Sequence, residues 1–370
     1  MTAVDPVAAE DFEIALCGPE DREEQARLFN ACFKKRLDAQ ALRWRYDQNP
    51  HGTAVSLVAR PTEGGDGVSG YACSPRQALC RGEEKSRAPI GETGDVMTHP
   101  EWRKRGIFSR LDRRAMEETA RQGWPVVFGL PNRRSAHIFL ELGWEQVGRI
   151  RPWTFVLKST TRAKALRRVD GRWRAFRTPA AHKRGRRARS ALREATQGRF
   201  GVRRIERFAA SVGELSRAVE QGFDLMVRRD ADYLNWRFIE NTAGLHTALG
   251  VYTAGGELVA YAIVQAPREG EVLGYLVDVL ARDEESLAQA MEAGLAQLEA
   301  AGAEVVQSTA IDGSWWQDRL QRAGFQPPRP ENHLIVILYT HDATHPLARA
   351  ARDASRWYLT DGDRDDETMG

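Results

Sequence analysis

The sequence predicts an α/β fold of the α+β kind, in which a mixed, mostly antiparallel sheet is flanked by helices and the whole unit occurs twice. Three observations carry this prediction. Extended segments dominate residues 12–98, strand and helix patterns alternate along residues 95–157, and similar landmarks return in the same order after residue 205. Antiparallel strands followed by strand–helix–strand–helix are typical of helices packed on a mixed sheet. A length of 370 residues accommodates two such units.

The first unit begins with an alternating segment at Phe12–Cys17, which predicts a strand, and an apolar stripe at Pro19–Phe33, which predicts a helix. Further strands are predicted over Ala54–Ala59 and Ser69–Leu79, because both are rich in apolar residues and bounded by turn residues. The stretch Ile90–Thr98 leads into the central strand of the predicted sheet.

The stretch Asp95–Leu111 is the part of the chain with the clearest binding chemistry. It predicts a short strand, a turn that begins at Pro100, and a helix that begins after Gly106. The turn carries three consecutive cations: Arg103, Lys104 and Arg105. A helix N-terminus has free N–H groups and a positive dipole end, so a basic turn at that point predicts a phosphate site.

A second strand and helix follow this motif. Trp124–Leu130 predicts a buried strand, Asn132 is a candidate N-cap, and a short apolar helical face ends at Gly143. At these residues the chain resembles the GNAT acetyltransferase superfamily. Its acetyl-CoA signature, Gln/Arg-x-x-Gly-x-Gly/Ala, matches Arg103–Phe108 at the first and fourth positions, and Phe108 stands where a small residue is usual. The order strand, Asn-x-x-Ser/Ala, helix and Leu-Gly-aromatic is similar to the second half of a GNAT core.

The resemblance implies roles for individual residues. Backbone N–H groups around Val96 and Met97 would polarise the acetyl carbonyl, and those of Arg105 to Ser109 would hold the pyrophosphate. The expected acetyl-CoA contacts are Val96, Met97, Thr98, Arg103, Lys104, Arg105, Gly106, Ile107, Phe108, Ser109 and Asn132.

The nearest carboxylates that could accept the proton of the attacking amine are Asp95 and Glu92. Each has a structural alternative: Glu92 could be a solvated charge at a strand edge, and Asp95 could cap a turn or pair with an arginine. The family often supplies a tyrosine to protonate the thiolate, but Phe139 stands at that position and has no proton to give. Water, or another tyrosine such as Tyr46 or Tyr71, would take this role.

The second unit repeats these landmarks but lacks the phosphate chemistry. Trp236–Phe238 corresponds to Trp44–Tyr46, and Val277–Val279 corresponds to Gly94–Val96. The following turn contains Asp283–Glu285 and no glycine, so it would repel pyrophosphate. The chain therefore looks like bacterial tandem GNAT proteins with a degenerate second domain, in which only the first domain binds CoA.

The expected domain division is 1–157 for the first GNAT domain, 158–208 for a basic linker or helical insert, 209–340 for the degenerate domain, and 341–370 for a C-terminal helix and acidic tail. Residues 158–208 contain eighteen Lys and Arg against three acidic residues, about +15, whereas the whole chain is only +3. Such a block is either a solvated linker or a surface for non-specific polyanion contact. The acidic tail is expected to be disordered and solubilising.

Other features exclude several classes of protein. No apolar run is long enough to span a membrane, and the N-terminus lacks a signal pattern, so a cytoplasmic protein is expected. Four widely spaced cysteines and eight dispersed histidines predict neither a disulfide framework nor a metal site.

The resemblance implies an acetyl- or acyl-CoA-dependent N-acyltransferase whose acceptor is the amine of a small polar molecule, such as an amino sugar. Two alternatives stay open. One is a non-catalytic protein that binds CoA, or a polyanion through residues 158–208. The other is a tandem-GNAT aminoacyl transferase of the cell-wall type, which takes its donor from tRNA and does not need a CoA signature.

Overall fold

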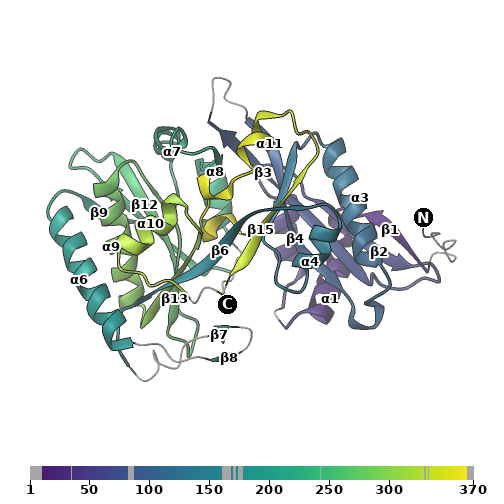
Figure 1. Cartoon of the computed structure of the whole chain (residues 1–370), viewed down its shortest axis with the longest axis horizontal. Helices are drawn as coiled ribbons and strands as arrows, with labels where there is room; N and C mark the ends of the chain where they lie inside the picture. Colours follow the sequence, from purple (N-terminus) through teal and green to yellow (C-terminus); the bar gives the residue numbers. More distant parts are fainter. Residues whose placement is uncertain are drawn as a thin grey trace.

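The structure is a computed structural model of the chain that describes residues 11–364 except 35, 82–86, 161–167, 170–171, 174–177, 242, 329–330 and 332. Within the described residues, fourteen strands form one continuous sheet, and Figure 1 shows that helices cover it in two lobes. Most neighbouring strands are antiparallel, while the pairs β4–β5, β13–β14 and β10–β16 are parallel. The predicted mixed, mostly antiparallel α/β fold is confirmed.

The first half of the chain contains β1 (Phe12–Leu16), α1 (Arg22–Cys32), α2 (Ala39–Asp47), β2 (Val55–Pro61), β3 (Ser69–Cys80), β4 (Arg87–Thr98), α3 (Ile107–Arg121), β5 (Val126–Gly129), α4 (Ala136–Glu141) and β6 (Glu145–Val156). The basic segment contains the small hairpin of β7 (Arg168–Val169) and β8 (Arg172–Trp173), then α6 (Thr178–Thr196) and β9 (Gly201–Ile205).

The second half contains α7 (Val212–Glu220), β10 (Leu225–Val227), α8 (Ala231–Leu234) with a π-helical turn (Asn235–Ile239), β11 (His246–Tyr252), β12 (Leu258–Gln265), β13 (Leu273–Ala281), α9 (Glu284–Ala300), β14 (Val305–Ile311), α10 (Trp315–Arg322), β15 (Leu334–Thr340), α11 (Pro346–Ala350) and β16 (Trp357–Tyr358).

The order of the main strands is symmetric about its centre: β1-β2-β3-β4-β5-β15-β6-β14-β13-β12-β11-β9. The two halves exchange their last strands, because β15 of the second half pairs with β5, and β6 of the first half pairs with β14. β6 and β15 also pair with each other, and Figure 1 shows both strands passing between the lobes. The order β1 to β5 thus recurs as β9, β11, β12, β13 and β14, which is the arrangement of a duplicated fold.

Alternation along β3 places successive side chains on opposite faces of the sheet. Tyr71 and Cys73 pack in the core under α3, together with Ile107 and Leu111, while Ala72 packs with α1 and α2 on the other face. Helices therefore cover both faces of the first half, as the sequence predicts.

Two tryptophans at equivalent positions of the two halves join the lobes. The rings of Trp44 and Trp236 are stacked with centroids 4.9 Å apart. Trp44 Nε1 donates to the Trp236 carbonyl at 3.1 Å, and Trp236 Nε1 donates to the Trp44 carbonyl at 3.0 Å. Because both rings are buried and both N–H groups are satisfied, this reciprocal contact fixes one half against the other.

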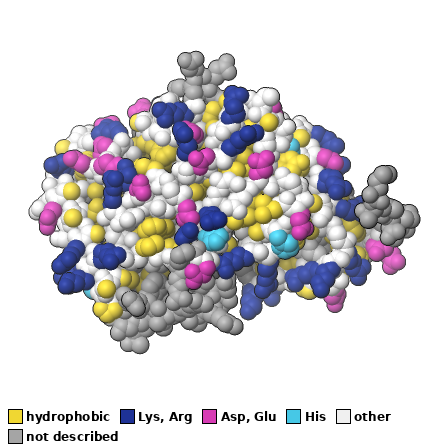
Figure 2. All heavy atoms as spheres, viewed as in Figure 1, with side chains coloured by type: hydrophobic (Ala, Val, Ile, Leu, Met, Phe, Trp, Pro, Cys, Tyr) yellow, Lys and Arg dark blue, Asp and Glu magenta, His cyan; other side chains and the backbone are white. Residues whose placement is uncertain are grey.

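The basic segment contributes regular structure to the second half. β9 pairs with β11, and α6 packs along α9, whose Glu292 and Glu299 bind Arg189 at 2.8 and 2.6 Å. Part of the positive charge therefore holds α6 to the protein. Lys183, Arg186 and Arg187 lie on the exposed side of α6, and the polyanion contact stays a prediction. On the face seen in Figure 2, cationic and anionic side chains are interspersed.

The expectation of a disordered, solubilising tail is wrong for the residues that the structure describes. Trp357, Tyr358, Thr360, Asp361 and Asp363 are each at most 2 % exposed. The reason is that aromatic residues and arginines of the second half surround this segment. The last six residues, 365–370, lie outside the described part of the chain. No helix among the described residues has the length and apolarity needed to cross a membrane.

Because the halves exchange strands, we propose that the predicted domain divisions are not independent folding units. These divisions are residues 1–157, 158–208, 209–340 and 341–370. A fragment of residues 1–157 lacks β15, the neighbour of β5, and lacks β14, a neighbour of β6. We expect this fragment to show no cooperative urea transition by circular dichroism, whereas the full chain unfolds in one transition. A cooperatively folded fragment would show that β6 can take the place of β15 by itself.

Candidate active site

A β-bulge in the central strand β4 lies at the centre of the predicted site. Gly70 pairs with Met97 and Ala72 pairs with Gly94, so that Tyr71 faces both Asp95 and Val96. Asp95 has φ 48°, a left-handed conformation that few residues other than glycine, asparagine and aspartate adopt. The bulge interrupts the ladder and turns the backbone groups of residues 95–96 away from their regular direction.

Beside this bulge, β4 and β5 separate. They pair in parallel at Gly91–Val127, Glu92–Phe128 and Thr93–Gly129, where β5 ends. A Cβ on Gly129 would lie 2.5 Å from Thr93 Cγ2, so a glycine is needed where the strands are still in contact. Beyond this point the edge of β4 that contains Asp95–Thr98 no longer has β5 as a neighbour. We call this separation of β4 and β5 the wedge, and the expected ligand contacts Val96, Met97 and Thr98 lie along it.

The basic turn lies at the end of this wedge and leads into α3. Lys104 has φ 66° and Gly106 has φ 72°, and a Cβ on Gly106 would meet nothing within 4 Å. Arg103 Nε donates to the Thr98 carbonyl at 3.2 Å, and the Arg105 guanidinium lies 4.6 Å from the centre of the Trp102 ring. These contacts fix the turn directly before α3, and the start of a helix stabilises an anion through its free N–H groups and its dipole.

Other predicted contact residues have structural roles as well. The Ile107 side chain is buried in the core, which leaves only its backbone for a ligand. Phe108 packs edge-on against Phe139 at 5.1 Å, and Phe139 packs in the same way against Trp144 at 5.1 Å. Phe108 therefore fills space between α3 and α4.

Asn132 lies at the entrance to α4, where its Oδ1 accepts hydrogen bonds from the backbone N–H groups of Arg134 at 2.9 Å and Ser135 at 3.2 Å. It caps the turn that precedes α4 and not the helix itself, which begins at Ala136. The predicted cap is thus displaced by one turn, because a short turn separates β5 from α4.

The two carboxylates proposed from the sequence meet on the α2 face of the sheet. Glu92 forms an ion pair with Arg76, and Asp95 forms one with Arg45. Tyr46 Oη donates to Asp95 Oδ2 at 2.7 Å, and burial raises the pKa of Tyr46 well above its ordinary value. Glu92 is not the solvated strand-edge charge of the structural alternative, since it is only 2 % exposed.

These side chains line a cavity of about 10 Å³, which Trp236 of the second half also lines. A space of that size holds one water at most. The sequence analysis missed Arg76. Arg76 lies on the same face of β3 as Ala72 and Ser74, opposite Ile90 and diagonal to Glu92, and the sequence contains no local signal of this register.

Across the sheet, Tyr71 is held from the α3 side. Tyr71 Oη donates to Asp112 Oδ1 at 2.7 Å, and Trp144 Nε1 donates to the same carboxyl group at 3.2 Å. Burial raises the pKa of Asp112 to about 6, although both hydrogen bonds oppose the shift. Tyr71 directly opposes the bulge, and Asp112 holds the Tyr71 side chain in place. Asp112 therefore supports the geometry of the bulge from the α3 side of the sheet.

The second half has the same splayed strands but a different helix start. β13 and β14 pair only at Leu273–Val305, Gly274–Val306 and Tyr275–Gln307. Asp283 Oδ1 accepts a hydrogen bond from the Ser286 N–H at 2.8 Å, and Glu284 and Glu285 follow in the first turn of α9. The positive end of this helix is therefore occupied by the chain's own carboxylates.

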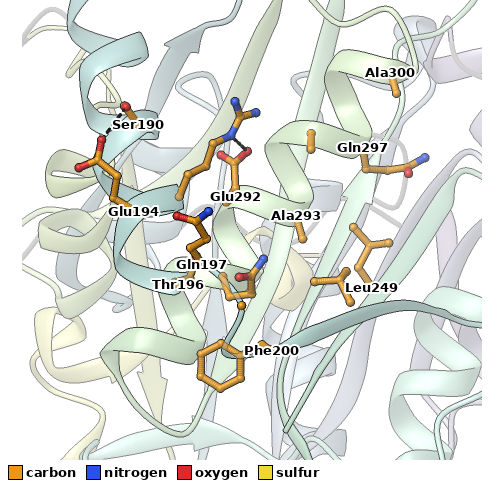
Figure 3. A pocket seen from close by; sticks show the side chains of 15 residues that line it. Ser190, Glu194, Thr196, Gln197, Phe200, Leu249, Glu292, Ala293, Gln297 and Ala300 are labelled. Atoms are coloured by element: carbon orange, nitrogen blue, oxygen red, sulfur yellow. Dashed lines mark hydrogen bonds and ion pairs between the residues drawn. The ribbon is translucent and has the colours of Figure 1, made fainter. Parts of the chain in front are cut away.

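A larger groove of about 730 Å³ lies elsewhere in the second half, between α6 and α9 (Figure 3). Its floor is largely apolar, with Phe200, Leu249 and Ala293, and the ion pair of Arg193 with Glu292 crosses it. None of the predicted site residues lines this groove. Among the described residues, no group of three or more His, Cys, Asp or Glu side chains is arranged to hold a metal ion.

Comparisons with known proteins agree with this geometry. Residues 13–147 match a family model described as an acetyltransferase (GNAT) domain. Residues 13–147, within the first half of the chain, are therefore similar to a GNAT acetyltransferase domain. No curated protein sequence matches the chain.

Solved structures extend the likeness in fold to about nine-tenths of the chain. A probable N-acyltransferase of Enterococcus faecalis V583 has a TM-score of 0.59 at 13 % identity, covering 89 % of this chain and 72 % of its own. Saccharomyces cerevisiae N-myristoyltransferase with bound myristoyl-CoA has a TM-score of 0.58 at 13 % identity, covering 92 % and 81 %. A tandem GNAT protein from the clavulanic acid biosynthesis pathway has a TM-score of 0.55 at 14 % identity, covering 89 % and 98 %. The tandem GNAT fold predicted from the sequence is thereby confirmed.

The phosphate site can be tested with two matched glycines. Gly106 and Gly123 lie at opposite ends of α3, have φ 72° and 73°, and a Cβ at either position would meet nothing within 4 Å. Glutamate at either position costs similar backbone strain, but only Gly106→Glu places a negative charge beside the basic turn. We expect Gly106→Glu to weaken acetyl-CoA binding by roughly 2–4 kcal/mol in calorimetry, while Gly123→Glu binds as the unaltered protein does. Equal affinities would place the site elsewhere.

The raised pKa of Asp112 predicts a specific pH dependence of stability. A carboxyl group whose pKa is about 6 in the folded state and 3.8 ordinarily binds its proton more tightly when folded, so the free energy of unfolding falls as pH rises through this window. The Asp112→Asn variant lacks this titration. In urea denaturation, its stability relative to the unaltered protein should rise by about 2 kcal/mol between pH 4 and pH 7. Glu117→Gln, which removes a carboxyl group from the exposed side of the same helix, is measured in parallel as the comparison variant.

Proposed function

We propose that this protein transfers an acyl group from acetyl-CoA, or from another short acyl-CoA, to the amine of a small polar acceptor such as an amino sugar. The observation that carries the proposal is the wedge between β4 and β5, with a bulge at Asp95 on one side and a glycine-opened helix start at its end. The GNAT fold of the chain supports acyl-CoA-dependent N-acyltransferase activity in general.

In this proposal, the pyrophosphate binds at the backbone N–H groups of Arg105 to Ser109, with Arg103 and Lys104 adding charge. The pantetheine arm follows β4 past Thr98 toward the bulge, with Asn132 on the other side of the wedge. Backbone N–H groups at Val96 and Met97 polarise the thioester carbonyl, because a donor fixed beside the developing oxyanion stabilises it without reorganisation.

The acceptor approaches from the α2 face of the sheet. Its amine attacks the carbonyl carbon, the C–N bond forms, and the C–S bond breaks to release the CoA thiolate. Asp95, or Glu92 through water, accepts the proton from the amine. Phe139 has no proton to give and is packed between Phe108 and Trp144, so water or a tyrosine protonates the thiolate.

The first experiment separates this proposal from its alternatives. A thermal shift is measured with acetyl-CoA and with tRNA, each at low and high salt. Acetyl-CoA should raise the midpoint at both salt concentrations. Stabilisation by tRNA alone would favour an aminoacyl transferase or a polyanion-binding protein. Acetyl-CoA binding without release of CoA thiol in the presence of amino sugars, amino acids and polyamines would favour a non-catalytic CoA-binding protein.

The proton acceptor can be identified once an acceptor substrate is known. Asp95→Asn suits this test because asparagine tolerates the left-handed backbone that residue 95 requires. We expect a decrease in turnover of about 10²–10⁴-fold with little change in acetyl-CoA affinity. Glu92→Gln removes a buried partner of Arg76, so its turnover is compared only after its stability has been measured. Near-normal turnover in both variants would assign proton removal to another group.

A further inference from the structure

The gap between β13 and β14 in the second half is occupied by the turn Asp361–Asp363. This turn belongs to the C-terminal segment of the chain, residues 357–364, which is yellow in Figure 1. The turn Asp361–Asp363 contacts both strands beyond the point where they separate. Asp361 Oδ2 accepts a hydrogen bond from the Thr309 N–H of β14 at 2.7 Å. The position equivalent to the wedge of the first half is therefore closed by residues of the same molecule.

Buried polar contacts hold this segment in place. Asp278, the counterpart of Asp95, accepts a hydrogen bond from Thr360 Oγ1 at 2.6 Å. Arg229 binds Asp278 at 3.2 Å and Asp363 at 2.7 Å, and all these side chains are about 1 % exposed. Removing one partner from such a network leaves a buried charge uncompensated, which makes the seating of the segment specific.

The packing leaves no space for a side chain in the middle of the turn. A Cβ on Gly362 would lie 3.0 Å from both Asp278 Cβ and Phe238 Cζ. Arg237 Nε donates to the Gly362 carbonyl at 3.2 Å, and the same guanidinium donates to the Arg364 carbonyl. The guanidinium of Arg237 thus binds the backbone of the C-terminal segment at two carbonyl groups.

Arg237 is also one residue away from the contact that joins the two halves. Its neighbour Trp236 stacks on Trp44, and the two exchange hydrogen bonds with each other's backbone. On the other side of Trp44, the next residue is Arg45, which forms the ion pair with Asp95. Short covalent and packed steps therefore connect the C-terminal segment to the carboxylate at the bulge.

We propose that the C-terminal segment permanently occupies the position in the second half that corresponds to the wedge of the first half. In this proposal, Gly362 and Arg237 are positioning residues for Asp95 in the first half. The inference rests on the proposed function, because it assigns these residues to the acceptor end of the acyl-transfer site. It assigns them no contact with acetyl-CoA, whose predicted contacts lie on β4, α3 and the start of α4.

The experiment uses the full chain and variants of graded severity. Gly362→Ala adds one methyl group against Asp278 and Phe238. Arg237→Met removes the donors to the segment, and Arg237→Lys restores a charge and a donor. Gly201→Ala is the control, since a Cβ there meets nothing within 4 Å and its φ is not left-handed. Hydrogen exchange is followed by mass spectrometry in peptides spanning residues 42–48 and 90–98, and acetyl-CoA affinity is measured by calorimetry.

Gly362→Ala and Arg237→Met should raise exchange in both first-half peptides about tenfold, with partial recovery in Arg237→Lys and no change in Gly201→Ala. Acetyl-CoA affinity should stay within about twofold, and turnover, where an acceptor is known, should fall at unchanged KM for acetyl-CoA. Faster exchange confined to residues 273–281 and 357–364 would overturn the inference and leave only a structural role for the segment. Failure of the unaltered protein to bind acetyl-CoA would instead refute the proposed function.

Discussion

The exchange of β6 and β15 is the constraint on which the rest of this structure depends. β15 lies between β5 and β6, and β6 lies between β15 and β14, so each half completes its sheet with a strand from the other. Backbone hydrogen bonds of central strands are obligatory in a buried sheet. The halves therefore cannot separate without leaving β5 and β14 each unpaired along one edge, and the stacked tryptophans Trp44 and Trp236 are held at one fixed place in the interface.

The same fold gives two different outcomes at the splayed strands. In the first half, β5 ends at Gly129 and a basic turn leads into α3, which leaves a wedge with a positive end. In the second half, Asp283 caps α9, and the C-terminal segment lies between β13 and β14. Both differences are local changes of side-chain charge and chain path, so the duplicated backbone geometry survives while only one of the two wedges keeps the chemistry suited to a phosphate ligand.

Much of this could be predicted from the sequence, because periodicity, turn residues and the recurring landmarks are local signals. The bulge at Asp95, the pairing of Arg76 with Glu92, and the burial of Asp361 and Asp363 could not. Each depends on which residues distant in sequence lie opposite one another. An acidic tail looks solvated when its arginine partner, Arg229, is more than a hundred positions away, and strand exchange leaves no trace in the order of strands along the chain.

The contacts around Asp95 show what the second half contributes to the first, although its own helix start lacks a basic turn. Asp95 occupies a strained left-handed position, and such strain persists only where the surroundings over-determine it. Arg45 and Tyr46 bind its carboxylate, and Trp44 ties their helix to Trp236 of the second half. Trp236 also lines the small cavity beside Asp95 and Glu92. In the proposed function, the second half therefore supplies a wall of the acceptor side of the site and a support for Asp95, and neither role needs a ligand bound in the second half.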